Sequence, residues 1–169
     1  MTDSHAAHLQ AVARSLRQRW ASGVAIVTVV IDDGQYRGIT VSSYVLVSGQ
    51  PPIIMVAFSH EVSFHRHVQV GGTVGLSVLE WEHEFLADRC AGRGPGPDAA
   101  FTGVPHDLIA GGIPVIRGAL ARCACRVERL EDVGDHVLML AEMIDGDLLP
   151  DMDDPLVRYE GRYRRLEAE

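Results

Sequence analysis

One hairpin near the N-terminus constrains the fold more than any other stretch of this sequence. Residues 24–31 are almost entirely β-branched, and residues 36–41 form a second strand-like run. Asp32-Asp33-Gly34 lies between the two runs, and Asp-Gly flanked by strand-forming residues is a strong signal for a tight turn. The sequence therefore predicts an antiparallel hairpin and a fold built around a β-sheet.

Strand-forming segments recur along the rest of the chain, whereas helical periodicity is confined to two places. The further predicted strands are residues 53–58, 73–79, 115–127 (centred near Ala119), 137–144 and 155–159. Apolar residues at helical spacing predict helices at 1–20, which should lid one end of a barrel, and at 80–90, with a short helix or turn at 62–70. About six or seven strands with few helices favour a mainly β fold with peripheral helices, a closed antiparallel Greek-key-like barrel, over a parallel α/β sheet.

The composition fits one domain over residues 1–169 and excludes several functions. The chain has 23 acidic and 15 basic residues, and its net charge of -8 disfavours nucleic acid as a partner. Every basic residue is arginine, so a Schiff-base lysine and the lysine of a P-loop are excluded.

The cysteines and the hydropathy pattern indicate in which cellular compartment the protein works. Cys90, Cys123 and Cys125 form no C-x-x-C pair, and their odd number suits a reducing environment. Cys123 and Cys125 alternate along a predicted strand, where they should fill a core or an interface. We see no secretory signal and no apolar run long enough to cross a bilayer, so we expect a cytoplasmic protein without membrane contact.

A glycine- and proline-rich stretch interrupts the second half of the chain. Residues 92–97 read Gly-Arg-Gly-Pro-Gly-Pro and cannot hold regular structure, so we expect a mobile loop over 91–112 that could serve as a lid. The glycines also suggest a nucleotide-binding loop, but the spacing is wrong, no strand precedes them, and proline interrupts them.

The polar segment 38–43, Gly-Ile-Thr-Val-Ser-Ser, follows directly from the first hairpin. Short hydroxyls and backbone N–H groups on a closely approaching backbone are what a flavin phosphate needs when no positive charge is available. Taken alone, the same composition favours a polar turn, where Ser and Thr clusters are commonest.

The order of the motifs along the chain favours the flavin-binding interpretation. Taken together, the motifs resemble the flavin reductase-like family of short-chain NAD(P)H:flavin oxidoreductases. The resemblance covers nearly the whole chain. The matching segments are 20–28, Asp33-Gly34, 38–44, Val47-Ser48, Pro51-Pro52, Phe64, Val78-Leu79, 118–120, 125–127, Gly134-Asp135-His136, Pro155-Leu156, Gly161 and Tyr163.

The resemblance implies an FMN-binding split β-barrel, usually a homodimer, with the flavin in a groove along the strands after the first hairpin. The residues that would line the flavin are Thr40, Val41, Ser42 and Ser43, with Val47 and Ser48 against the edge of the ring. Ser59 and Ser63 correspond to positions that help to hold the phosphate, where His60 and His65 would supply part of the missing charge.

His136 falls where the family places a histidine near the flavin and the nicotinamide, and it is our candidate catalytic residue. A histidine can donate to a carbonyl oxygen or change its charge near neutral pH, and Asp135 beside it can orient the loop or raise its basicity. The alternative is a histidine that caps a tight turn, with Asp135 making the turn's hydrogen bond.

The last predicted strand would approach the pyridine nucleotide. Relatives often carry an arginine at the position of Glu160, whereas here arginines flank it on both sides. The candidate nucleotide-binding residues are therefore Arg158, Tyr159, Gly161 and Arg162, and which arginine meets the pyrophosphate stays open. Ser77 likewise replaces a common asparagine, and Leu46 replaces a serine.

The function that the resemblance implies is reduction of FMN or FAD by hydride transfer from NADH or NADPH, with delivery of reduced flavin to a partner monooxygenase. The main alternative is a non-catalytic flavin- or haem-binding protein on the same barrel. A pyridoxine-phosphate oxidase-like enzyme suits an acidic chain without lysine poorly. We expect no metal, because His60, His65 and His67 lack a clear further ligand and no C-x-x-C or H-E-x-x-H motif accompanies them.

Overall fold

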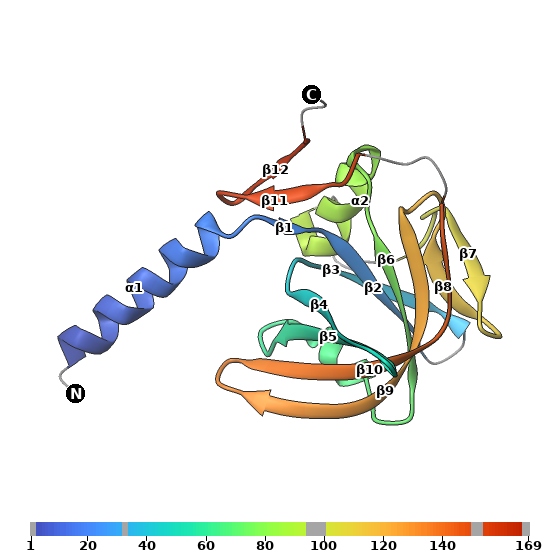
Figure 1. The fold of residues 1–169 in the computed structure, drawn as a ribbon, viewed down its shortest axis with the longest axis horizontal. Coiled ribbons are helices and arrows are strands. Elements are labelled where there is room, and N and C mark those ends of the chain that lie inside the picture. Colours follow the sequence, from blue (N-terminus) through green and yellow to red (C-terminus); the bar gives the residue numbers. More distant parts are fainter. Residues whose placement is uncertain (1–2, 32–33, 94–100, 150–153, 167–169) are drawn as a thin grey trace.

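The predicted N-terminal hairpin is present in the computed structural model, in which β2 (Ala25–Val30) pairs with β3 (Tyr36–Val41) (Figure 1). The structure describes residues 3–31, 34–93, 101–149 and 154–166. The turn residues Asp32 and Asp33 thus lie outside the described residues. The hairpin closes beside them, where the backbone N–H of Ile31 donates to the carbonyl of Gln35 at 2.8 Å.

This hairpin forms one edge of a seven-stranded antiparallel sheet with the order β3-β2-β6-β9-β10-β5-β4. The remaining strands are β4 (Tyr44–Gly49), β5 (Pro52–Ser59), β6 (Thr73–Val78), β9 (Ala121–Val133) and β10 (His136–Leu148). β3 and β4 stand at opposite edges of the sheet, although only Ser42 and Ser43 separate them in the chain. The sheet must therefore curl until its two edges meet at these serines, which makes it a barrel.

Smaller elements surround the barrel. A three-stranded sheet contains β1 (Ser22–Gly23), β11 (Val157–Tyr159) and β12 (Arg162–Arg164), and a separate hairpin contains β7 (His106–Ile109) and β8 (Ile113–Ile116). The helices are α1 (Asp3–Arg19) and α2 (Glu84–Asp88), with shorter turns η2 (Ser63–His67), η3 (Trp81–His83) and η4 (Arg89–Arg93). The predicted mainly β, antiparallel fold class is confirmed. No helix in the described ranges has the length and hydropathy to cross a bilayer.

β2 is apolar except for Thr28, because both of its faces are buried. The Thr28 hydroxyl is buried as well and donates to the carbonyl of Pro114. Val27 and Val29 belong to the cluster inside the barrel, which also contains Phe58 and Met139. Ile26 faces the opposite way, into a second cluster under α2 and the small hairpins. A strand covered on both sides shows no polar alternation. As expected, Cys123 and Cys125 also fill the barrel core, with their sulfur atoms 3.5 Å apart.

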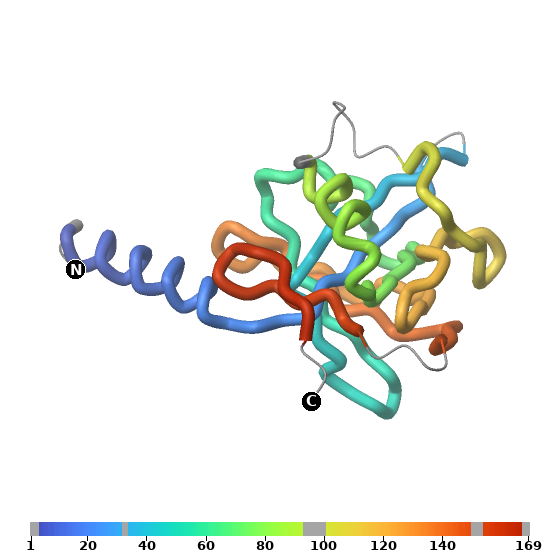
Figure 2. Tube along the Cα trace, turned by 90° about the horizontal axis from the view of Figure 1, so that it is seen from above, coloured from blue at the N-terminus to red at the C-terminus, as the bar shows by residue number. Residues whose placement is uncertain are grey.

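The expectation that the N-terminal helix lids the barrel is wrong. α1 projects away from the barrel in both views (Figures 1 and 2). Its apolar residues Leu9, Val12 and Leu16 are 47–59% exposed, and Trp20 after it is 68% exposed. Only Trp20 and Ala21 separate α1 from β1. The helix contacts the body at its C-terminal end, where Glu160 N–H donates to the carbonyl of Gln18.

The single strand expected over residues 115–127 is also wrong. The chain leaves β8 at Ile116, turns at Gly118 with φ +79°, and enters β9 at Ala121. Segment 91–112, expected to be a mobile loop, contains strand β7 and the buried Phe101 and Val104. Its glycine- and proline-rich residues 94–100 lie outside the described residues. The pairing of β7 with β8 and the burial of Phe101 and Val104 explain why residues 101–112 are structured.

Candidate functional site

A cavity of about 840 Å³ lies along the free edge of β3. An edge strand presents backbone N–H and C=O groups that no neighbouring strand satisfies, so this edge can bind a polar ligand. Residues of β3, η2, η4 and the segment before β7 line the cavity, among them Tyr36, Gly38, Thr40, Ser63, Cys90, Phe101 and His106. The volume falls within the range of small-molecule and cofactor sites in proteins.

Gly38 allows the cavity wall to pack closely against β3. A Cβ atom on Gly38 would lie 3.2 Å from ring carbons of Phe101 and 3.3 Å from the sulfur of Cys90. Burial raises the pKa of the Cys90 thiol to about 11, although the Arg89 charge opposes this rise. The thiol is therefore protonated at neutral pH and acts as part of the wall, not as a nucleophile.

An aromatic cluster closes the cavity on the side of the β7–β8 hairpin. The ring of His106 lies edge-on to Tyr36 and to Phe101, with ring centroids 5.2 and 5.1 Å apart. Its Nδ1 lies 2.7 Å from the carbonyl of Val104. A carbonyl only accepts hydrogen bonds, so Nδ1 carries the hydrogen and Nε2 of the neutral ring is an acceptor. The wall thus offers a polar ligand one acceptor with a defined tautomer.

Two of the predicted flavin-binding residues, Thr40 and Ser63, line this cavity. The Thr40 hydroxyl donates to the carbonyl of Ala87 at 2.7 Å and so ties the end of β3 to α2. Val41, the next residue, points into the barrel core and is 6% exposed. Thr40 and Val41 therefore sit on opposite sides of the same strand, as alternation requires.

Ser59, His65 and His136 gather at the end of β5, beside η2. Ser59 pairs in register with His136 on β10, and the rings of His60 and His65 meet edge-on with centroids 5.5 Å apart. His136 Nδ1 donates to Asp135 at 2.6 Å, and this hydrogen bond holds the pKa of the Asp135 carboxyl below its usual range. In the part of the chain that the structure describes, no three His, Cys, Asp or Glu side chains are placed to hold a metal ion.

Ser42 and Ser43 form the seam at which the two edges of the sheet meet, and they connect β3 to the region of Ser59 and His136. Ser43 is exposed, and its carbonyl accepts a hydrogen bond from the N–H of Ala57 on β5 at 2.9 Å. Ser42 before it is half-buried. Ser42 and Ser43 therefore lie between the cavity residue Thr40 and the strand that carries Ser59.

The other predicted ligand residues lie elsewhere in the single chain. Val47 lies at an irregularity in the β4–β5 ladder and Ser48 directly after it, about 13–17 Å along the strand from Ser43. The nucleotide candidates Arg158, Tyr159, Gly161 and Arg162 lie on or between β11 and β12, where the Arg158 guanidinium lies over the ring of Tyr163 at 5.1 Å. None of these six residues lines the β3 cavity.

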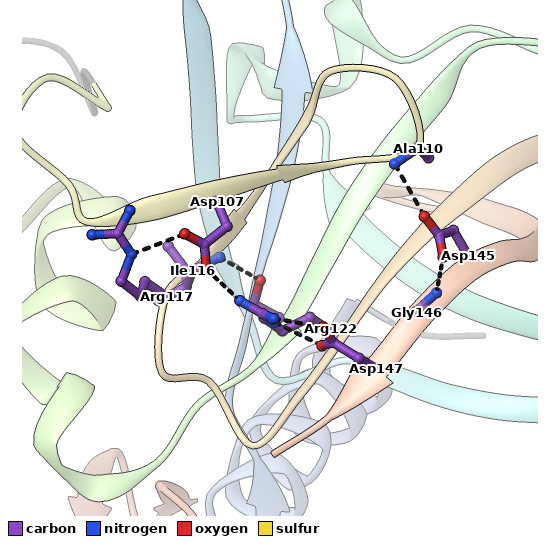
Figure 3. Close-up of polar contacts among 9 residues, drawn as sticks. Asp107, Ala110, Ile116, Arg117, Arg122, Asp145, Gly146 and Asp147 are labelled. Carbon is purple, nitrogen blue, oxygen red and sulfur yellow. Dashed lines mark hydrogen bonds and ion pairs between the residues drawn. The ribbon is translucent and has the colours of Figure 1, made fainter.

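A second cavity of about 390 Å³ lies between β4, β6, β9 and the end of β10, and its lining is mainly apolar. Burial raises the pKa of Tyr44 in this lining to about 12. Arg122, also in the lining, contacts the carboxylates of Asp107 and Asp147 (Figure 3). Its hydrogen bonds hold the pKa of Asp147 below the usual range.

Sequence reasoning missed this charged cluster, although Asp145-Gly146-Asp147 carries a signal for it. Alternation along β10 places both aspartates on one face and Gly146 on the opposite face, where it is paired with Cys123 on β9. A Cβ on Gly146 would lie 2.7 Å from the carbonyl of Arg122 and 3.1 Å from Cβ of Cys123. An Asp-Gly-Asp sequence in a strand therefore indicates two things: close packing at the glycine on one face of the sheet, and negative charges on the opposite face.

Comparison with known families decides the relationship of this chain. The family described as flavin reductase like domain matches residues 17–167. The chain belongs to the flavin reductase-like family. This family membership agrees with the resemblance expected from the ordered motifs.

Known members of the flavin reductase-like family are similar over most of the chain. An NADH-dependent flavin reductase from Rhodococcus sp is 32% identical over 151 residues, which cover 88% of this chain and 82% of the relative. The solved NADH:FAD oxidoreductase of Streptomyces globisporus C-1027 has a TM-score of 0.84 at 30% identity, covering 95% of this chain and 94% of that one. The same enzyme has also been solved in complex with NAD and FAD fragments. The reductase component of 4-hydroxyphenylacetate 3-monooxygenase from Pseudomonas aeruginosa is 28% identical, covering 92% of both chains.

Proposed function

We propose that this protein is an NADH-dependent flavin reductase that reduces FMN or FAD. The observation that carries the proposal is the cavity along the free edge of β3, in a chain whose relatives are NADH-dependent flavin reductases. The flavin, when bound, supplies the acceptor for the hydride that leaves C4 of the nicotinamide. The protein's task is then to orient the two ligands and to exclude water.

The seam of the barrel supplies the flavin-binding groups in this proposal. Among the described strands, β3 has no partner on the side of the cavity, so its backbone N–H and C=O groups are available there, and Ser42 and Ser43 extend this polar edge. Ser59, Ser63 and His65 would bind the phosphate with hydroxyl and imidazole groups, because the chain has no lysine. Val47 and Ser48 are assigned to the ring edge.

His136 would act on the nicotinamide side of the flavin. Its Nδ1 is committed to Asp135, so its Nε2 is the atom left to meet a ligand. The hydride passes without a proton, so His136 orients the ligands and does not serve as the acid for this step. Arg158 or Arg162, with Tyr159 and Gly161, would bind the nucleotide.

The residues assigned to the flavin and to the nucleotide lie apart within one chain. A homodimer would bring them together, because each copy could contribute residues to the site of the other. Large apolar side chains are exposed on α1 (Leu9, Val12, Leu16) and on β4 (Val45, Leu46, Val47), with exposures of 46–59%. Such unpartnered apolar surfaces favour association. We propose that a second copy covers them and completes the site.

We further propose that the reduced flavin passes to a partner monooxygenase in the cytoplasm. One relative is the reductase component of such a system. The three cysteines are free and buried, which suits a reducing compartment.

The deciding experiment mixes the purified protein with free FMN or FAD and adds NADH or NADPH. We expect loss of nicotinamide absorbance together with flavin bleaching under anaerobic conditions, faster with NADH than with NADPH. Flavin binding without oxidation of either nucleotide would replace the proposal with the non-catalytic flavin-binding alternative. Haem binding in place of flavin binding would indicate the haem carrier.

A further inference from the structure

The β7–β8 hairpin carries His106 into the cavity wall, and a group of charged side chains holds the base of this hairpin against the barrel. We call this group the Arg122 clasp: Arg122 on β9, Asp147 on β10, Asp107 on β7 and Arg117 after β8 (Figure 3). The clasp joins β7, the turn after β8, β9 and β10 through side chains that are 10 to 25 residues apart in the sequence.

Arg122 is the centre of the clasp. Its Nε and Nη2 donate to the two carboxylate oxygens of Asp147 at 2.7 and 2.5 Å, and its Nη1 donates to Asp107 at 2.6 Å. The Arg122 side chain is only 12% exposed. A planar guanidinium that is paired on two sides and shielded from water is a rigid anchor.

Arg117 completes the clasp and reaches the backbone of His106. Its Nε donates to the second oxygen of Asp107, and its Nη2 donates to the carbonyl of His106, both at 2.9 Å. His106 is thus fixed by its carbonyl, by its Nδ1 bond to Val104, and by ring contacts with Tyr36 and Phe101. At the far end of the hairpin, the N–H of Ala110 donates to Asp145 at 3.1 Å.

We propose that the Arg122 clasp positions His106 so that Nε2 accepts a hydrogen bond from a donor of the bound flavin nucleotide. His106 is the ligand-binding residue in this proposal, and the four clasp side chains are positioning residues. Suitable donors on such a ligand are a ribityl hydroxyl, a ring N–H or an exocyclic amine. The inference rests on the proposed flavin-reducing function for the identity of the ligand.

The geometry favours a positioning role over simple surface pairing. Exposed ion pairs contribute little and tolerate movement, whereas Arg122 is shielded and bonds both carboxylates. The clasp also ends on the backbone of a cavity-lining residue. Its loosening should therefore change ligand affinity through His106 more than it changes turnover.

The test combines Asp147→Asn, His106→Phe and the double variant. Phenylalanine keeps the ring contacts with Tyr36 and Phe101 but has no nitrogen to accept a bond. We expect Asp147→Asn to raise the Kd for FMN at least five-fold, measured by quenching of flavin fluorescence, with kcat at saturating flavin changed less than two-fold. In the His106→Phe background, the same substitution should have no further effect, because coupled residues are not additive.

Two further variants supply a replacement for Asp147→Asn and a control. Arg117→Met removes an exposed partner and serves if Asp147→Asn does not fold; it should also raise the Kd for FMN. Glu131→Gln is the matched control, because it removes a carboxylate that pairs with Arg129 on β9 without contacting the hairpin. Glu131→Gln should leave the Kd unchanged.

Amide hydrogen exchange without ligand separates the clasp from the proposed function. Asp147→Asn should increase exchange at residues 106–109 but not in β2. Unchanged exchange there, a Kd within two-fold of wild type, or an equal effect in the His106→Phe background would overturn the proposal. If the wild type bound no FMN, the ligand assignment would fall together with the proposed flavin site, while the exchange result would still decide whether the clasp positions His106.

Discussion

Gly38 and Phe101 are packed so closely that a methyl group on Gly38 would lie 3.2 Å from the aromatic ring. All three residues line the β3 cavity, and the sulfur of Cys90 would lie 3.3 Å from the same methyl group. The absence of one side chain therefore sets how the wall meets the strand that we assign to the flavin.

Gly38→Ala should push Phe101 and Cys90 away from β3 and distort the cavity. We expect a destabilisation of about 1–3 kcal/mol, typical of overpacking, and weaker FMN binding. Gly49→Ala is the matched control, because a Cβ atom on Gly49, at the end of β4, would meet nothing within 4 Å. Urea unfolding and fluorescence titration measure both effects, and equal stability of the two variants would contradict the close contact.

His136→Ala should raise the KM for NADH and lower turnover, each by about ten-fold, since it removes a group that orients ligands without making or breaking bonds. FMN affinity should stay within a few-fold of wild type. Steady-state kinetics and a separate FMN titration distinguish these effects. Full turnover with an unchanged KM for NADH would show that His136 only caps its turn.

Cys90 should resist alkylation in the folded protein. Its pKa of about 11 leaves about 100-fold less thiolate at pH 8 than an ordinary cysteine near pKa 9 would have. We expect iodoacetamide to label Cys90 slowly in buffer and fully in urea, as followed by mass spectrometry of the Cys90 peptide. Labelling as fast as that of free glutathione would contradict the burial of the thiol.

The clasp carboxylates predict how stability depends on pH. Hydrogen bonds from Arg117 and Arg122 lower the pKa of Asp107, and those from Arg122 lower the pKa of Asp147, below the unfolded value of about 3.9. A lowered folded pKa stabilises the protein above the unfolded pKa, and this stabilisation is lost as the pH falls through the folded pKa. The stability difference between wild type and Asp147→Asn, measured by urea unfolding, should be constant from about pH 8 to 5 and shrink below about pH 4.

Charge on the apolar face of α1 should disrupt the proposed dimer. The double variant Leu9→Glu, Leu16→Glu should raise the dimer dissociation constant at least about ten-fold, because two half-exposed apolar contacts become charged. Gln10→Glu adds charge to the same helix and is the control. Sedimentation equilibrium measures the association, and a monomeric wild type would contradict the dimer directly.

Much of the local structure was predictable from the sequence. β2 and β3 follow from β-branched runs around Asp-Gly, and β5, β6 and β10 follow from similar runs, since β-propensity and alternation are properties of neighbouring residues. Short strands such as β1, β7 and β12 were missed, because two to four residues carry too little pattern. The flavin-binding assignments of Thr40 to Ser43 came from the order of motifs and stay proposals.

By itself, then, the sequence determined the strand-rich fold class, the first hairpin and the likeness to flavin reductases. The tertiary structure alone decided that Ser42 and Ser43 join the two edges of one sheet, that α1 projects outward, and that Arg122 meets Asp107 and Asp147. The physical reason is separation along the chain. Local spacing selects strands and turns, whereas barrel closure and the clasp depend on contacts between segments whose pairing no local pattern specifies.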